Sequence, residues 1–134
     1  MMNRLIFLLT AASKYLLPLW AVLIIVSSTI PGIGTAKIDT GGTEIRLDYL
    51  FHFIVYAVLA FLAVLYFIPV PSFTGLMRPT FTGAALLIFA MANEFIQLLI
   101  PGRSYNPADL ASNAAGVISG FTITLLITRN IKRN

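Results

Sequence analysis

The fold is decided by residues 50–68, LFHFIVYAVLAFLAVLYFI, an apolar run of 19 residues that only His52 interrupts. A helix needs about 20 apolar residues to cross the hydrocarbon core of a bilayer. Two prolines, Pro69 and Pro71, follow the run and end the helical pattern. The stretch therefore predicts a helix that spans a membrane.

Three further apolar runs of similar length flank this one. They are residues 15–31 (YLLPLWAVLIIVSSTIP), 82–100 (TGAALLIFAMANEFIQLLI) and 110–128 (LASNAAGVISGFTITLLIT). We place Pro18 within about the first turn of the first helix, where a missing N–H is tolerated. The opening residues 1–13 look like a signal peptide, but their apolar core is short and runs directly into a longer one, so we expect no cleavage. The sequence thus predicts one all-α domain over residues 1–134, a polytopic membrane protein built as a four-transmembrane-helix bundle.

The composition excludes several other classes of protein. Of the 134 residues, 58% are hydrophobic and only 10% are charged, whereas a soluble domain has about 25% charged residues. The chain has no cysteine and a single histidine, which excludes disulfides and thiolate chemistry and leaves too few ligands for a zinc site. The net charge is +4, but the basic residues lie at the ends of apolar runs rather than in a polar stripe. We therefore expect no metal, no cofactor and no nucleic-acid partner.

The distribution of basic residues predicts an orientation in the membrane. With the amino terminus in the cytoplasm, six basic residues lie inside and three outside. The inside set is Arg4, Lys14, Arg78, Arg129, Lys132 and Arg133, and the outside set is Lys37, Arg46 and Arg103. This bias follows the positive-inside rule. Four crossings then leave both termini in the cytoplasm.

Polar residues from separate segments fall at one depth in this topology. They are Asp48 and His52 in the second helix, Glu94 and Gln97 in the third, Arg103 in the turn that follows it, and Asp109 and Asn113 at the start of the fourth. Ionisable groups inside a membrane are costly unless they are paired or face a wet cavity. We therefore take these seven residues as the candidate binding site at the outer face, with His52 and Glu94 as candidates for catalysis.

Helical geometry places several of these groups on common faces. At 100° per residue, Asp48, His52 and Tyr56 form one stripe. Asp109 and Asn113 share a face with Gly116-x-x-x-Gly120, a small-residue groove that lets another helix approach closely. The bundle can therefore close over its polar groups.

Structural explanations also exist for several of these groups. His52 and Asn113 could each make an interhelical hydrogen bond of modest energy, and Asp109 could cap the fourth helix. Arg103 could pair with Glu94 or Asp109 to fix the turn. For Ser27, Ser28 and Thr29, we expect hydroxyl bonds to the preceding helical turn.

Taken together, these motifs resemble the VanZ-like family of small multipass membrane proteins. The matching elements are Ser27-Ser28 with Pro31, Asp48 with His52-Phe53 and Tyr56, Glu94-x-x-Gln97, Gly102-Arg103, and Asp109-x-x-x-Asn113-x-x-Gly116-x-x-x-Gly120. They cover residues 16–120, and Tyr49 stands where the family often has lysine. The resemblance implies a protein of the bacterial cytoplasmic membrane and cell envelope, in a family named for a member that lowers susceptibility to the glycopeptide teicoplanin.

These observations predict that the outer face binds a polar or anionic headgroup. The headgroup would be lipid-linked or part of a glycopeptide. The other expected partners are membrane lipids. An oligomeric state does not follow from the sequence. The alternative is a membrane enzyme acting on a lipid phosphate or glycan linkage, with His52 as acid or base and Asp48 or Glu94 orienting it. A third class is a small proton-coupled exporter built around Glu94.

Overall fold

A computed structural model describes residues 2–30, 37–39, 44–67, 77–102 and 104–131. Its helices are α1 (Met2–Thr29), α2 (Leu47–Phe67), α3 (Met77–Gln97) and α4 (Pro107–Ile131). All four are long and apolar enough to cross a membrane. The predicted all-α fold with four membrane-spanning helices is therefore confirmed.

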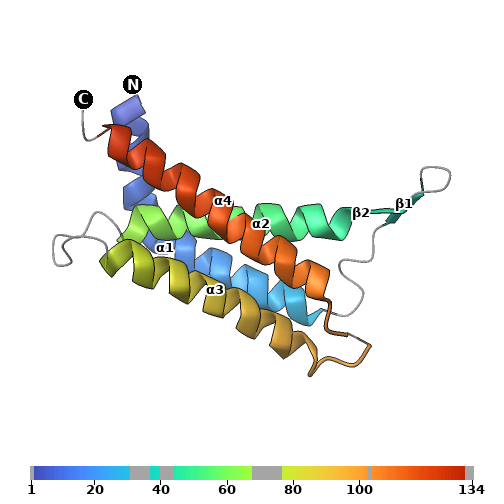
Figure 1. The fold of residues 1–134 in the computed structure, drawn as a ribbon. Helices are drawn as coiled ribbons and strands as arrows, with labels where there is room; N and C mark the ends of the chain where they lie inside the picture. The colour runs from blue at the N-terminus through green and yellow to red at the C-terminus, as the bar shows by residue number, and fades with distance from the viewer. Residues whose placement is uncertain (1, 31–36, 40–43, 68–76, 103, 132–134) are drawn as a thin grey trace.

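Successive helices run in opposite directions, so the bundle has two distinct ends (Figure 1). The start of α1 and the end of α4 lie at one of them, as four crossings require. At the other end, α1 and α3 terminate and α2 and α4 begin. Large apolar side chains cover much of the outer surface, for example Phe7, Ile88 and Leu99, which are 72%, 65% and 80% exposed. Such a surface suits lipid rather than water.

The first helix is longer than the apolar run from residue 15 suggests. It begins at Met2, and Pro18 lies in its interior instead of its first turn. The opening residues therefore belong to the same helix as the predicted span. A proline inside a helix removes one backbone hydrogen bond and bends the helix. Figure 1 shows this bend, since the beginning and the end of α1 run in different directions.

A small hairpin between α1 and α2 was not predicted. Strand β1 (Lys37–Asp39) pairs antiparallel with β2 (Glu44–Arg46), and Ile38 lies opposite Ile45. Figure 1 shows the hairpin extending beyond the bundle, where it leads directly into α2. The sequence here is rich in glycine and short of apolar residues, so the segment was expected to be a loop.

The closest helix contact joins α2 and α4. A Cβ atom added to Gly116 would collide with the Phe53 carbonyl oxygen, and one added to Gly120 would collide with the Ala57 carbonyl oxygen. Only glycine permits two backbones to approach so closely. The predicted small-residue groove is therefore confirmed, and its partner is α2. This contact fixes how the first turns of α2 and α4 face each other.

The first helix joins this pair through the middle of the bundle. The indole N–H of Trp20 donates a hydrogen bond to the Val55 carbonyl oxygen (3.0 Å). The hydrophobic core around it is formed by Ile24, Tyr56, Leu59, Ala60, Ala63, Leu86, Ala90 and Val117. The helices thus enclose a common apolar core, and polar side chains gather toward one end of it.

Candidate functional site

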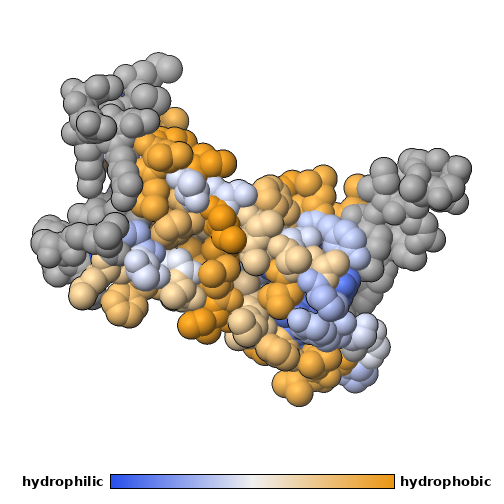
Figure 2. Space-filling view, viewed as in Figure 1, coloured by the Kyte–Doolittle hydropathy of each residue, from blue (hydrophilic) through white to orange (hydrophobic). Residues whose placement is uncertain are grey.

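The polar side chains of the candidate site lie inside the bundle, at the end where α2 and α4 begin. We call this set the polar cluster: Asp48, His52, Glu94, Gln97, Asp109 and Asn113. All of them are buried except His52, which is half-buried. Figure 2 shows hydrophilic residues gathered where α3 ends and α4 begins. Two of the side chains, Glu94 and Asn113, have no exposed surface at all.

The imidazole of His52 lies between two side chains of α4. Its Nδ1 is 2.9 Å from Asn113 Oδ1, and its Nε2 is 4.0 Å from Asp109 Oδ2. The first distance is that of a hydrogen bond, and the second is longer than one. The carboxylate that faces His52 is therefore Asp109, whereas the sequence pointed to Asp48 or Glu94.

The position of the histidine proton depends on the orientation of the Asn113 amide. As oriented, the amide oxygen accepts from Nδ1–H, and Asn113 Nδ2 has no acceptor among the residues the structure describes. A turned amide would instead donate to Nδ1 and leave the proton on Nε2, facing Asp109. The two arrangements differ in whether Nε2 is an acceptor or a donor. This is the property that a general acid or base requires.

The start of α4 is capped by Asn106 rather than by Asp109. The Asn106 Oδ1 accepts a hydrogen bond from the Ala108 N–H (3.0 Å), and Pro107 occupies the first helical position. Asparagine followed by proline is a favourable helix start, because the side chain caps and the ring needs no N–H partner. Asp109 therefore lies in the first turn of the helix, where its side chain faces His52.

Glu94 connects α3 to the segment that precedes α4. Its Oε1 accepts a hydrogen bond from the Asn106 N–H (3.2 Å). Between these residues, α3 ends in a tighter turn, and Gly102 adopts a positive φ of 81° that suits glycine. Glu94 thus holds the α3–α4 connection in place. Arg103, the cation expected here, lies outside the described residues.

The other predicted groups occupy the same end of the bundle. Asp48 is buried in the first turn of α2, and its Oδ1 accepts from the Tyr49 N–H (3.1 Å). Gln97 is the last residue of α3 and is buried as well. Tyr56, one turn beyond His52, is buried against Phe89, with ring centroids 6.3 Å apart. The predicted stripe of Asp48, His52 and Tyr56 therefore lies along the interior.

One interhelical contact was missed by sequence reasoning. The Ser28 hydroxyl lies 2.9 Å from Asn93 Oδ1, which joins the end of α1 to α3. The expected local bonds are also present, since Ser27, Ser28 and Thr29 bond the carbonyl oxygens three residues earlier. Only the position of Ser28 inside the bundle distinguishes it from its neighbours.

The chemistry available at this site is that of an imidazole, carboxylates and amides. Within the described ranges, no group of three or more histidine, cysteine, aspartate or glutamate side chains is arranged to hold a metal ion. Searches of family models, curated proteins and solved structures found no match to this chain. A function for the chain therefore has to be inferred from its residues and from the geometry of the polar cluster.

Proposed function

We propose that this chain is a VanZ-like integral membrane protein of the bacterial cell envelope that binds a polar or anionic headgroup at its outer face. The observation that supports this is the polar cluster itself. Side chains from α2, α3 and α4 meet at one end of the bundle, next to its hydrophobic core. Polar groups are costly in a membrane and commonly mark a binding or transport site.

The basic residues support an orientation in the bacterial cytoplasmic membrane with both termini inside. Arg4 near the start of α1 and Arg78 at the start of α3 belong to the end opposite the polar cluster, and Lys14 lies near the middle of α1. Cytoplasmic ends carry the excess of lysine and arginine. In this orientation the polar cluster faces outward, toward lipid-linked cell-wall intermediates and glycopeptides.

The residue types suggest the chemistry of the ligand. Arg103 lies in the α3–α4 connection by sequence, and we assign to it the contact with a phosphate or carboxylate. A guanidinium binds such groups through two parallel hydrogen bonds. Asp109 and Glu94 would hold the guanidinium, while His52, Gln97 and Asn113 would supply the remaining hydrogen bonds.

Teicoplanin susceptibility tests this function. Cells expressing the wild-type chain should tolerate more teicoplanin than cells with an empty vector, and Arg103→Ala should remove the difference. Arg103→Lys should give an intermediate level, because an ammonium cannot form the paired bonds. Ser112→Ala is the matched control, since this hydroxyl bonds the Ala108 carbonyl oxygen of its own helix. Equal tolerance in the wild type and Arg103→Ala would refute the role of Arg103. Topology reporters at both termini test the orientation on the same variants.

The surroundings of His52 favour a second candidate, a membrane enzyme acting on a lipid phosphate or glycan linkage. A ring nitrogen near a carboxylate, with the other nitrogen held by an amide, is an arrangement used in acid–base catalysis. In this case the purified protein would turn over an envelope lipid, and His52→Ala would abolish turnover while leaving the lipid bound. Binding without turnover in the wild type would favour the first candidate.

A further inference from the structure

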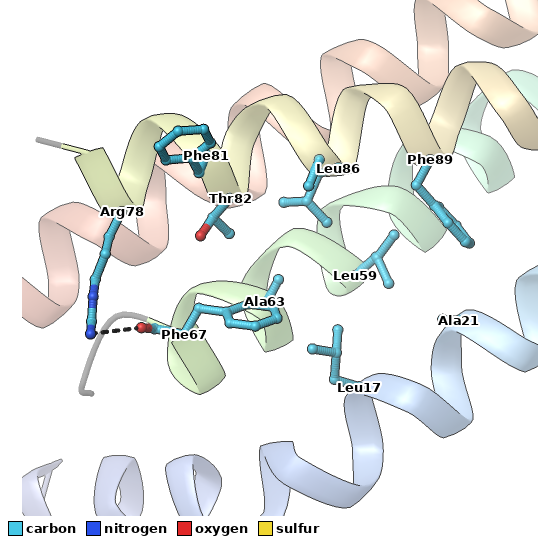
Figure 3. Close-up of a pocket in the computed structure, with 11 residues that line it drawn as sticks. Leu17, Ala21, Leu59, Ala63, Phe67, Arg78, Phe81, Thr82, Leu86 and Phe89 are labelled. Atoms are coloured by element: carbon cyan, nitrogen blue, oxygen red, sulfur yellow. Dashed lines mark hydrogen bonds between the residues drawn. The ribbon is translucent and has the colours of Figure 1, made fainter. Parts of the chain in front are cut away.

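A second feature lies at the opposite end of the bundle, between α1, α2 and α3. It is a pocket of about 510 Å³. Its walls are apolar and include Leu17 and Ala21 of α1, Leu59 and Ala63 of α2, and Leu86 and Phe89 of α3. Figure 3 shows Leu17, Leu59 and Leu86 facing one another across the space. The volume is within the range of about 300–1,000 Å³ that is usual for ligand sites.

One end of the pocket carries a buried cation. Arg78 is only 7% exposed, and its Nη1–H donates to the carbonyl oxygen of Phe67, the last residue of α2 (3.2 Å). Figure 3 shows this bond at the edge of the pocket, with the Thr82 hydroxyl one helical turn further along. A guanidinium has five N–H donors in a planar array, so it can bind an anion while it holds a carbonyl oxygen. The site therefore joins an apolar space to a positive charge.

The dimensions of the pocket match one leaflet of a bilayer. From Arg78 to Phe89 its wall extends along α3 for about 16 Å at 1.5 Å per residue. This length is about half of the ~30 Å hydrocarbon thickness. The rim residues Phe67 and Phe81 are 47% and 65% exposed, so the pocket is open toward the surrounding lipid.

We propose that this pocket binds one anionic phospholipid of the surrounding leaflet, with an acyl chain between α1, α2 and α3 and its phosphate at Arg78. Charge complementarity selects the anionic headgroup, and the apolar walls select an attached chain rather than a free anion. The inference is independent of the function proposed for the polar cluster, because the two sites use different residues at opposite ends of the bundle.

The single tryptophan provides the test. Trp20 lies on α1 between the pocket residues Leu17 and Ala21 in the sequence but does not line the pocket, so quenching beyond that caused by the bulk lipid reports a brominated chain nearby. The protein would be reconstituted in vesicles that contain phosphatidylglycerol or phosphatidylcholine with brominated acyl chains. We expect quenching to give an affinity for phosphatidylglycerol about fivefold higher, the preference that one basic residue typically provides.

Three variants separate the contributions. Arg78→Gln should bring the preference close to onefold, and Arg78→Lys should retain part of it. Ala85→Phe, at another lining position, should weaken quenching by both lipids because it narrows the pocket. Arg4→Gln is the matched control, since it removes an exposed basic residue at the same end of the bundle and should leave the preference unchanged. Circular dichroism would check that each variant folds.

Several outcomes would overturn the proposal. One is a preference that Arg78→Gln and Arg78→Lys leave unchanged, and another is equal quenching by both lipids in the wild type. Loss of the preference on addition of inorganic phosphate would show that a free anion, rather than a lipid, occupies the Arg78 end. Insensitivity to Ala85→Phe would show that the chain does not enter the pocket.

Discussion

The two ends of this four-helix bundle differ: one holds a close helix contact beside polar side chains, and the other holds an apolar pocket. At one end, His52, Asp109 and Asn113 lie together beside the contact where α2 and α4 touch backbone to backbone. At the other, α1 and α3 stand far enough from α2 to leave an apolar pocket that ends at Arg78. Gly116 and Gly120 allow α2 and α4 to approach closely, whereas the space between α1, α2 and α3 is lined in part by small side chains such as Ala21 and Ala63. The two ends therefore differ in how closely their helices pack.

The largest expected effect comes from breaking the close contact. In Gly116→Leu, the new side chain would meet the backbone of Phe53, which cannot move aside cheaply. We expect a loss of about 3 kcal/mol in the free energy of unfolding, the upper end of the usual cost of overpacking. Unfolding in mixed detergent micelles would measure it.

Gly83→Ala provides the control for this substitution. Its added Cβ would lie 3.7 Å from the Phe121 ring, an ordinary contact, so stability should change little. If both variants were equally stable, the backbone contact between α2 and α4 would not hold the polar end together.

The second prediction concerns the cap of α4, which positions Asp109 toward His52. Asn106→Ala removes the acceptor for the Ala108 N–H and should cost about 1 kcal/mol. Asn106→Ser retains a capping oxygen and should lose only a small part of this. Chemical denaturation of the two variants would compare them, and an equal loss in both would contradict the capping role.

A third, smaller effect should come from the pair of His52 and Asn113. A double-mutant cycle with His52→Ala and Asn113→Ala should give a coupling of about 0.6 kcal/mol, as interhelical hydrogen bonds in membranes typically do. A cycle of His52→Ala with Ser112→Ala should be additive, because this serine bonds within its own helix. Additivity in both cycles would show that the contact between His52 and Asn113 does not contribute to the free energy of unfolding.

The smallest effect is expected at the hydrogen bond between α1 and α2. Trp20→Phe removes the indole donor to the Val55 carbonyl but retains most of the apolar surface, so it should cost about 0.5 kcal/mol. Thermal unfolding followed by circular dichroism would measure the loss. A larger loss, comparable to that of Gly116→Leu, would mean that α1 contributes as much as the α2–α4 contact.

Hydropathy was sufficient to predict the four spans, because each is a long apolar run with few charges. It could not place the start of α1, since the residues before Lys14 are themselves apolar and helical, nor could it show that Pro18 bends the helix. The hairpin was missed because three-residue strands carry too little alternation.

The site was predicted in its residues but not in its pairings. Helical angles group His52 with Asp48 and Tyr56, and Asn113 with Asp109. They do not say which of these side chains meet, or which carboxylate comes closest to the ring. That choice depends on the rotation of α4, which the Asn106 cap and the glycine contact set together. The Arg78 pocket was not predicted, since it arises from space between helices and not from any motif.

The contact between α2 and α4 also has a consequence for biosynthesis. These helices are separated by all of α3, and the chain from Phe67 to Ile131 takes about 3 to 13 s to synthesise at 5–20 residues per second. During that time His52 is already in its helix, while Asp109 and Asn113 have not yet been inserted beside it. The imidazole of His52 acquires its partners only when the last helix is inserted. A nascent chain that stalls before α4 would therefore expose this imidazole to the insertion machinery and to membrane proteases.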